Sequence, residues 1–266
     1  MDSPTLITAV TNQKGGVGKT ATTLNVGGAL AESGLNVLLL DLDPQGHLTD
    51  GLGISQAPAG EGSANLYRAL IGEYTGSLAD LITPHSAPAG RLDLVPNTIE
   101  MFMAVRELDK QRAREQRLAR LLSAVRGIYD HVLIDAPPSL DILTDNALTA
   151  ADGVLIPVQA EDSSLKALRL LLPQIASVDA DLRETPLELH GLVVSLLRRP
   201  ITKLAESVLA EFERLDGLPI LGTIPLGVVV TEAWRSGRTV VDYAPDSEHA
   251  QAYRALAKTL AGGGQR

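Results

Sequence analysis

The sequence predicts an α/β protein with a doubly wound, mostly parallel sheet and helices on both faces. Short apolar runs rich in β-branched residues alternate with longer helical patterns along the 266 residues. The runs are apolar throughout, as in Val37–Leu40, which is expected when helices cover both faces of a parallel sheet. No linker-like stretch interrupts the alternation, so we expect a single domain over 1–266, with a flexible tail at 262–266.

Each apolar run predicts one strand, and each longer pattern between two runs predicts a helix. The predicted strands lie near 6–11, 36–41, 92–95, 131–135, 153–158, 190–194 and 220–224. The predicted helices lie near 19–33, 64–72, 99–126, 142–150, 164–178, 202–215 and 247–261. Two stretches rich in Gly, Pro and Ser, 53–63 and 83–90, flank the second helix and indicate an insertion after the second strand.

Composition excludes several classes of protein. The chain is 45% hydrophobic and 21% charged, which is typical of a globular domain and excludes disorder. It has no cysteine, so disulfides, thiol nucleophiles and Cys-ligated metals are excluded. The N-terminus lacks the basic and apolar segments of a secretory signal, and no apolar run approaches the roughly 20 residues of a membrane helix. We therefore expect a cytoplasmic protein.

The formal charge of −9 argues against a surface uniformly built for nucleic acid or anionic membrane. The charge is uneven along the chain. Residues 1–97 and 98–197 each carry −5, whereas 198–266 carry +1. Any nucleic-acid contact is therefore expected to be local.

A glycine-rich segment, Lys14-Gly15-Gly16-Val17-Gly18-Lys19-Thr20, lies between the first predicted strand and the first predicted helix. In this order, backbone N–H groups and a helix N-terminus converge on phosphate oxygens. The glycines allow close backbone approach and positive φ. Lys19 can reach the terminal phosphates, and the Thr20 hydroxyl can ligate Mg²⁺. The segment therefore predicts a P-loop.

Three aspartates lie where two predicted strands end. Side chains alternate along a strand, so we expect Asp41 and Asp43 to point the same way, toward the edge that carries the phosphate loop. Asp135 closes another strand, the arrangement in which an acid faces Mg²⁺ across the sheet. The five histidines show no metal-ligand spacing, and no nucleophilic triad competes with this site.

The phosphate loop departs from the general pattern, because Gln13 stands where that pattern begins with glycine and Lys14 follows. With this lysine the chain resembles the deviant Walker A ATPases, and among them the ParA/Soj-type partition ATPases. The resemblance covers nearly the whole chain through Asn12–Thr20, Asp41–Gly46, Ile134–Ser139 and Pro157–Glu161. Nitrogenase-iron-protein-like relatives are excluded, because their cluster needs cysteines.

The resemblance implies a slow, Mg²⁺-dependent ATPase that dimerises with ATP. Lys14 then reaches the partner's nucleotide, Lys19 acts in cis, and Asp43 orients or activates water. Thr20, Asp41 and Asp135 form or support the Mg²⁺ shell. The implied nucleotide contacts are Lys14, Gly15, Gly16, Val17, Gly18, Lys19, Thr20, Ala21 and Pro225. The implied partners are non-specific double-stranded DNA and a ParB-like centromere-binding protein, without a membrane, on the nucleoid.

Two departures from the family pattern concern the nucleotide and the DNA contacts. Ala21 replaces a threonine after the loop, and we expect nucleotide binding to survive because the backbone N–H remains. The arginines that usually follow Ile224-Pro225 are absent, whereas basic residues cluster nearby. The candidate DNA-binding residues are Arg198, Arg199, Lys203, Arg235 and Arg238. The basic run Arg106–Arg120 also contains acids at helical spacing and is better interpreted as a self-paired solvated helix.

Two other functions remain open. A MinD-like or cargo-positioning ATPase would act on a membrane or a protein assembly, but the Ala-rich C-terminal helix lacks bulky apolar anchors. A metabolic amidoligase or kinase of the same fold would need a substrate pocket, and no segment of the sequence identifies one.

Overall fold

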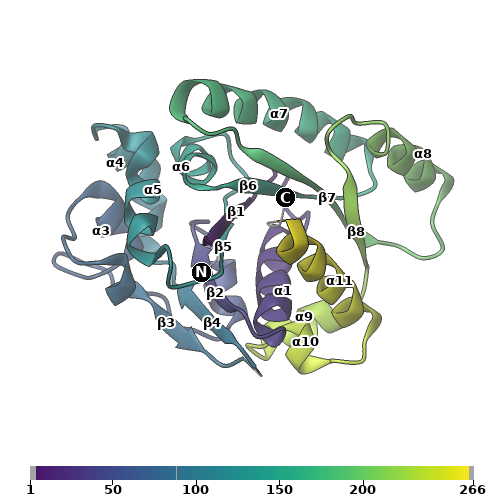
Figure 1. Cartoon of the computed structure of the whole chain (residues 1–266), viewed down its shortest axis with the longest axis horizontal. Helices are drawn as coiled ribbons and strands as arrows, with labels where there is room; N and C mark the ends of the chain where they lie inside the picture. The colour runs from purple at the N-terminus through teal and green to yellow at the C-terminus, as the bar shows by residue number, and fades with distance from the viewer. Residues whose placement is uncertain (1–3, 88, 264–266) are drawn as a thin grey trace.

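The computed structural model describes residues 4–87 and 89–263. Its strands form one eight-stranded sheet in the order β3-β4-β2-β5-β1-β6-β7-β8 (Figure 1). All neighbouring strands are parallel except β3, which runs antiparallel to β4 at the edge. The strands are β1 (Leu6–Val10), β2 (Asn36–Asp41), β3 (Thr83–His85), β4 (Arg91–Val95), β5 (His131–Asp135), β6 (Gly153–Val158), β7 (Glu188–Leu197) and β8 (Ile220–Pro225).

Helices connect these strands and cover the sheet. The α-helices are α1 (Lys19–Glu32), α2 (His47–Gly51), α3 (Leu66–Ile71), α4 (Ala104–Leu108), α5 (Arg117–Leu122), α6 (Ile142–Ala150), α7 (Asp162–Leu182), α8 (Lys203–Phe212), α9 (Val228–Arg235), α10 (Val240–Tyr243) and α11 (Glu248–Gly263). Four 3₁₀ helices are η1 (Leu78–Leu81), η2 (Ile99–Met103), η3 (Arg114–Gln116) and η4 (Ser123–Val125). The doubly wound parallel architecture predicted from the sequence is confirmed.

Two hydrophobic cores lie on opposite faces of the sheet. Leu38 and Leu40 of β2 belong to the core that packs under α3 to α8. Val37 and Leu39 of the same strand belong to the core under α1 and α11. Figure 1 shows these two layers, with α5, α6 and α7 on one side and α1 and α11 on the other. Side chains alternate along each strand, so a run that is apolar at every position fills both cores.

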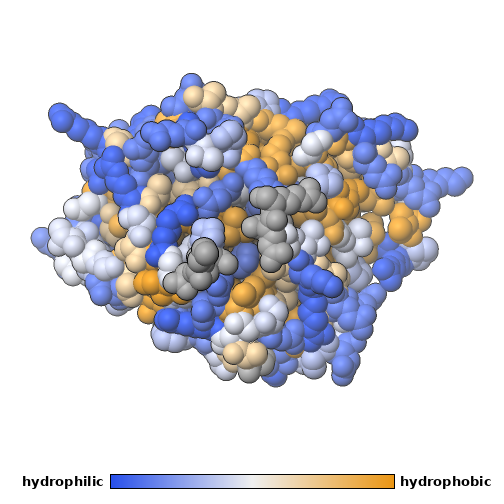
Figure 2. Space-filling model, viewed as in Figure 1, coloured by the Kyte–Doolittle hydropathy of each residue, from blue (hydrophilic) through white to orange (hydrophobic). Residues whose placement is uncertain are grey.

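The surface between α7 and α8 is partly apolar. Figure 2 shows hydrophobic residues there, over β7 and β8, and smaller hydrophobic patches lower on the same face. Large apolar side chains of this region and of the loop after β8 are exposed: Leu170, Ile201, Leu204, Leu226 and Val228.

The parallel register brings three strand ends together. Val10 of β1 pairs with Asp135 of β5, and Asp135 pairs with Asp41 of β2. The phosphate loop follows β1 and the residues around Asp43 follow β2, so both leave the sheet at the same edge. This carboxyl edge is where open α/β sheets place their ligands.

The predicted helix over 99–126 is wrong, because the chain there is divided among η2, α4, η3, α5 and η4. Ala113 has a φ of 46°, which a helix interior does not allow. Asn146 of α6 stabilises the break, since its Oδ1 accepts the Leu118 N–H at 3.0 Å and its Nδ2 donates to Arg114 O at 2.8 Å. A distant side chain thus replaces hydrogen bonds that a continuous helix would make within itself.

Two smaller differences from the predicted elements occur at the edge strand of the sheet and at the C-terminus. Residues 83–85, within a stretch predicted as loop, form the edge strand β3. Of the predicted tail, Gly262 and Gly263 close α11, and 264–266 lie outside the described residues.

Candidate functional site

The loop between β1 and α1 is open toward the carboxyl edge. Gly16 and Gly18 have φ angles of 73° and 82°, which favour glycine. A Cβ built at Gly15 or Gly16 would have no atom within 4 Å, so the backbone there faces free space. At Gly18 the same Cβ would contact Ser195 at 3.4 Å. The loop is thus closed on the β7 side and open where a phosphate would approach.

A pocket of about 510 Å³ lies in front of this loop. Its size is within the range of small-molecule sites. Its lining residues come from the loop, the segment after β2, the segment after β5, β7 and α9: Gly15, Gly16, Gly18, Lys19, Thr20, Ala21, Asp43, Gln45, His47, Pro138, Leu196, Val230, Thr231 and Trp234. Of the nucleotide contacts expected from the sequence, Lys14, Val17 and Pro225 are not among them. Pro225 is buried, and its carbonyl lies 3.1 Å from His249 Nε2.

Lys19, Thr20 and Asp135 meet at the floor of the pocket. The Thr20 hydroxyl donates to Asp135 Oδ2 at 2.8 Å, and Lys19 Nζ donates to the Lys14 carbonyl at 3.3 Å. Burial lowers the pKa of Lys19, while the nearby carboxylates of Asp135 and Asp43 act in the opposite direction. Burial raises the pKa of Asp135 well above its usual range, and the neighbouring Asp41 adds to this rise. The floor therefore concentrates ionisable groups that lack solvent.

Asp41 lies beside Asp135, away from the pocket surface. Its Oδ2 accepts the Thr49 N–H at 2.8 Å and the Thr49 hydroxyl at 2.6 Å. Its Oδ1 is buried without a hydrogen-bond partner among the described residues. Burial raises the pKa of Asp41 to about 7, against the opposing hydrogen bonds from Thr49. An orphaned carboxylate oxygen beside a second buried carboxylate is costly unless a cation or a proton is shared there.

The oxygens of Thr20, Asp41 and Asp135 suit Mg²⁺ better than a metal that is bound by protein ligands alone. Among residues 4–87 and 89–263, no three His, Cys, Asp or Glu side chains are placed to hold a metal ion together. Mg²⁺ is usually held by one or two carboxylates together with substrate phosphates and water, and a P-loop hydroxyl can add a further ligand. The Thr20 hydroxyl, Asp135 and the free Asp41 oxygen meet that requirement beside a phosphate loop.

Asp43 lies at the pocket wall and is 6% exposed. Its Oδ1 accepts the Gln45 N–H at 3.0 Å. Its carbonyl accepts the Gly46 N–H at 2.9 Å and the Asn97 side-chain amide at 2.6 Å. Asp41 and Asp43 thus have different surroundings, because Asp41 contacts Thr49 of α2 whereas Asp43 faces the pocket.

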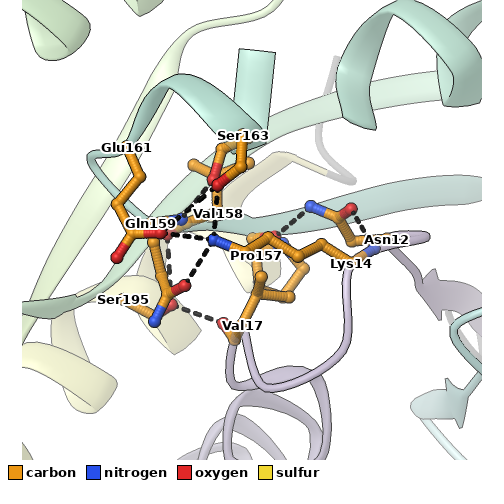
Figure 3. Close-up of polar contacts among 10 residues, drawn as sticks. Asn12, Lys14, Val17, Pro157, Val158, Gln159, Glu161, Ser163 and Ser195 are labelled. Carbon is orange, nitrogen blue, oxygen red and sulfur yellow. Dashed lines mark hydrogen bonds and ion pairs between the residues drawn. The ribbon is translucent and has the colours of Figure 1, made fainter. Parts of the chain in front are cut away.

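Lys14 extends from the loop toward the start of α7, as Figure 3 shows. Its Nζ donates to Gln159 Oε1 at 2.8 Å, to Glu161 Oε2 at 2.5 Å and to Ser163 Oγ at 2.8 Å. The hydrogen bond from Lys14 lowers the pKa of Glu161. The two lysines of one loop therefore have separate environments, one in the pocket floor and one outside it.

The start of the loop is fixed to the neighbouring strands. Asn12 Nδ2 donates to Pro157 O at 2.7 Å, and Asn12 Oδ1 accepts the Lys14 N–H at 3.0 Å (Figure 3). The Ser195 hydroxyl lies 2.5 Å from Val17 O and 3.1 Å from Val158 O. These contacts hold the loop backbone in place before any ligand arrives.

Comparison with known proteins agrees with this geometry. Residues 5–188 match the AAA domain family AAA_31. The chain is 40% identical to the sporulation initiation inhibitor protein Soj of Bacillus subtilis, over 97% of this chain and 99% of Soj. It is 38% identical to the chromosome partitioning protein ParA of Caulobacter vibrioides, over 97% and 94% of the two chains. The chain belongs to the ParA/Soj-type partition ATPases.

Two solved structures of other proteins are similar to this ParA/Soj-type chain. Cobyrinic acid a,c-diamide synthase from Mycobacterium smegmatis, solved with ADP and magnesium, has a TM-score of 0.80 at 33% identity, over 96% of this chain and 94% of that one. A McdA variant of Cyanothece, solved as its ATP complex, has a TM-score of 0.82 at 21% identity, over 97% and 96%. The second likeness shows the fold alone.

The five basic residues singled out from the sequence differ in their contacts. Arg199 pairs with Glu248 at 3.1 Å and Arg238 with Asp242 at 2.5 Å. Arg198 lies on the rim of a second pocket of about 500 Å³ that also contains Glu161. Lys203 begins α8 and Arg235 ends α9.

The other basic run, Arg106–Arg120, pairs with its own acids. Lys110 contacts Glu107 at 2.7 Å, and Arg114 contacts Asp109 at 2.7 Å. The predicted self-pairing is confirmed for Lys110 and Arg114, whereas Arg117 and Arg120 contact Gln111 and Gln116 instead, and the run is not one helix.

Several residues at the site carried no signal in the sequence. Trp234, the single tryptophan, lines the pocket from α9 and donates to His47 O at 3.0 Å. Leu196 lines the pocket with a φ of 54°, a strained conformation for leucine and one that is common at functional sites. Ser195 holds the loop. These three are remote from the motifs in sequence, so only the fold brings them to the site.

The described part of the chain also bears on a membrane role. Within residues 4–87 and 89–263, no helix combines the length and apolar character needed to cross a bilayer.

Proposed function

We propose that this ParA/Soj-type protein is a Mg²⁺-dependent ATPase switch that dimerises with ATP, binds DNA without sequence preference and drives chromosome or plasmid segregation. One observation carries the proposal. Lys19, Thr20, Asp135 and Asp43 converge from three segments at a glycine-rich phosphate loop, beside a pocket that a nucleotide would fill. The magnesium and nucleotide of the 33%-identical synthase structure support the same ligands here.

The residues of the pocket divide the chemistry. Lys19 neutralises charge on the terminal phosphates, and the loop N–H groups orient them. Thr20, Asp135 and Asp41 would hold Mg²⁺, which supplies charge stabilisation on the β- and γ-phosphate oxygens when bound. Asp43 lies at the wall where water can enter, and it orients that water and accepts its proton. Ala21 lines the pocket and still offers its backbone N–H to the nucleotide.

Lys14 gives the switch its dependence on a partner copy. Its Nζ lies outside the pocket floor, so in the dimer it would contact the nucleotide of the other subunit. Hydrolysis then removes the γ-phosphate that both lysines hold, and the dimer separates. A slow basal rate, accelerated by a ParB-like centromere-binding protein, fits a switch whose duration is set by hydrolysis.

The contacts of Lys14 within its own subunit are expected to weaken the ATP-dependent dimer. To reach a second subunit, Nζ must leave Gln159, Glu161 and Ser163. Because exposed pairs contribute about 0.2–1 kcal/mol each, and two subunits are involved, Glu161→Gln should tighten the ATP-dependent dimer between about 2- and 30-fold. Analytical ultracentrifugation with a non-hydrolysable ATP analogue measures the dissociation constant of the dimer. Lys14→Ala is the control that should lose the dimer. An unchanged dissociation constant in Glu161→Gln would refute the weakening effect of the Lys14 contacts.

We propose the basic residues Arg198, Arg199, Lys203, Arg235 and Arg238 as the DNA contacts. Arg199 and Arg238 are held by surface ion pairs, which contribute about 0–1 kcal/mol, so DNA phosphates can replace Glu248 and Asp242. A dimer doubles this modest set of charges. Binding should therefore be salt-sensitive and local.

Reversal of charge tests this surface. Arg198→Glu with Arg199→Glu should weaken binding to random-sequence duplex and lower the slope of log affinity against log salt by about 1 for each lost phosphate contact. Fluorescence anisotropy across a salt series measures both quantities. The matched control, Arg106→Glu with Arg112→Glu at two exposed arginines of the other basic run, should bind like the wild type. If the Arg198→Glu, Arg199→Glu variant keeps its affinity for DNA, the DNA contacts lie elsewhere on the protein.

The amidoligase function has one observation in its favour, the 33% identity to cobyrinic acid a,c-diamide synthase. An amidoligase needs an acid substrate before it consumes ATP, whereas a partition switch hydrolyses ATP with water alone. Phosphate release from Mg²⁺-ATP without any other small molecule, and its rise with DNA and partner protein, therefore separates the two functions.

A further inference from the structure

Asn97 lies two residues after the end of β4, beside the segment that follows β2. The two strands are parallel neighbours, with Val95 paired to Leu40, so Asn97 follows its strand at the same edge as Asp43 follows β2. Its side chain is fully buried, with 0% exposure. It is not a lining residue of the nucleotide pocket, and its sequence neighbourhood carries no phosphate or metal motif.

The hydrogen bonds of Asn97 join both halves of the candidate hydrolytic site. Its Nδ2 donates to Asp43 O at 2.6 Å and lies 3.5 Å from Asp41 O. Its backbone N–H donates to Thr49 Oγ1 at 2.8 Å, and that hydroxyl donates to Asp41 Oδ2 at 2.6 Å. Its carbonyl accepts the Ala57 N–H at 2.7 Å. One residue thus fixes the backbone of Asp43 and the support of Asp41.

The backbone of the β2 segment is shaped to receive this contact. Gly46 has a φ of 69°, and a Cβ built there would lie 3.6 Å from Asn97 Cβ and 3.1 Å from Gln56 Nε2. The turn from Asp43 to Gly46 closes through the Gly46 N–H, which donates to Asp43 O at 2.9 Å. Asp43 O therefore receives two donors, one from its own turn and one from the Asn97 side chain.

We propose that Asn97 is a positioning residue for hydrolysis, which holds Asp43 at the distance and angle that water attack requires. The inference rests on the proposed ATPase function. Asn97 does not line the nucleotide pocket, so its loss should leave ATP binding in place and slow the chemical step. A misplacement of about 1 Å at a catalytic group reduces the rate by about 100-fold.

A structural asparagine of the same kind is present nearby. Asn65 is also 0% exposed, and its Nδ2 donates to a backbone carbonyl, Pro58 O, at 2.7 Å and to Glu100 Oε2 at 2.8 Å. None of these contacts involves Asp41 or Asp43. Asn65→Ala therefore reproduces the loss of a buried amide without the proposed effect on the site.

Single-turnover hydrolysis of bound Mg²⁺-ATP compares Asn97→Ala with Asn65→Ala. We expect the rate per bound ATP to fall between about 10- and 100-fold in Asn97→Ala, with ATP affinity changed less than about twofold. Asn65→Ala should hydrolyse bound ATP like the wild type. Because hydrolysis is counted per bound ATP, loss of folded protein does not imitate this result. Asn97→Leu keeps a similar size but removes the donor, and should be equally slow.

Amide hydrogen exchange gives a second readout. The N–H groups of Gln45 and Gly46, both bonded to Asp43, should exchange faster in Asn97→Ala and not in Asn65→Ala. If Asn97→Ala hydrolyses bound ATP at the wild-type rate, the positioning role is overturned and the ATPase function stands. If the wild type does not hydrolyse ATP, the ATPase function is wrong and the inference falls with it.

Discussion

Replacing Lys19 by alanine is expected to abolish ATP binding. The lysine is 6% exposed and lies in the floor of the pocket, next to Asp135 and Asp43. The phosphates lose a charged donor that is worth about 1.5–3 kcal/mol for each hydrogen bond, so the loss of two such bonds should lower the affinity by at least about 100-fold. The removal also leaves two carboxylates without their nearest cation, which further disfavours an anionic ligand.

Isothermal calorimetry with Mg²⁺-ATP measures the affinity of Lys19→Ala, and the fluorescence of Trp234 gives an independent signal, because this single tryptophan lines the pocket. Lys14→Ala is the matched control, with the same substitution at the other lysine of the same loop. Since Lys14 Nζ lies against Gln159 and Glu161, we expect its loss to spare ATP binding by the monomer. Equal ATP affinity in Lys19→Ala and the wild type would refute the phosphate-site assignment.

The sequence predicted the parts of the site that are local in the chain. The P-loop is a strand, a glycine-rich turn and a helix start in one continuous segment, so spacing alone identifies it. Asp41 and Asp135 end strands that are apolar over most of their length, and parallel strands end at one edge. The sequence therefore predicts that these two strand ends lie close together, and the pairing of Asp41 with Asp135 agrees with this prediction.

The rest depends on contacts between distant segments. Asn97 and Trp234 lie 54 and 187 residues from the atoms they bond, Asp43 O and His47 O, and neither belongs to a motif. The break in the predicted helix 99–126 depends on Asn146, a residue of α6. Helix propensity describes neighbours in sequence, so it has no information about a hydrogen bond from another helix.

The structure shows which charged groups of the chain lie on its surface and which are buried or paired. Part of the acidity lies beneath the pocket, where Asp41 and Asp135 are 0% exposed and add little to the surface field. Part of the basicity is neutralised on the surface, as in the pair of Arg254 with Glu32 at 2.6 Å. The charge seen by a partner is therefore local. Arg198 lies near Glu161 and the Lys14 contacts, so the proposed DNA surface adjoins the residues proposed for the dimer.

Replacing Asp43 by asparagine is expected to stop hydrolysis while keeping the ATP-bound dimer. Asparagine preserves the shape and an acceptor for the Gln45 N–H, but it cannot take a proton from water. Loss of a positioned acid or base typically reduces a rate between about 10²- and 10⁴-fold. ATP binding should persist, because Lys19, Thr20 and the loop N–H groups remain. The protein should therefore accumulate as a dimer with intact ATP.

Multi-angle light scattering after incubation with Mg²⁺-ATP reports the dimer, and radiolabelled ATP reports its hydrolysis. Asp50→Ala is the matched control, since Asp50 is an exposed acid of α2 near Asp41 that does not line the pocket. It should hydrolyse ATP and return to the monomer like the wild type. If Asp43→Asn still hydrolyses ATP at the wild-type rate, the water is oriented by another group. If it hydrolyses slowly but does not dimerise, the ATP-bound state alone is insufficient for assembly, and the role of Lys14 across the dimer would have to be abandoned.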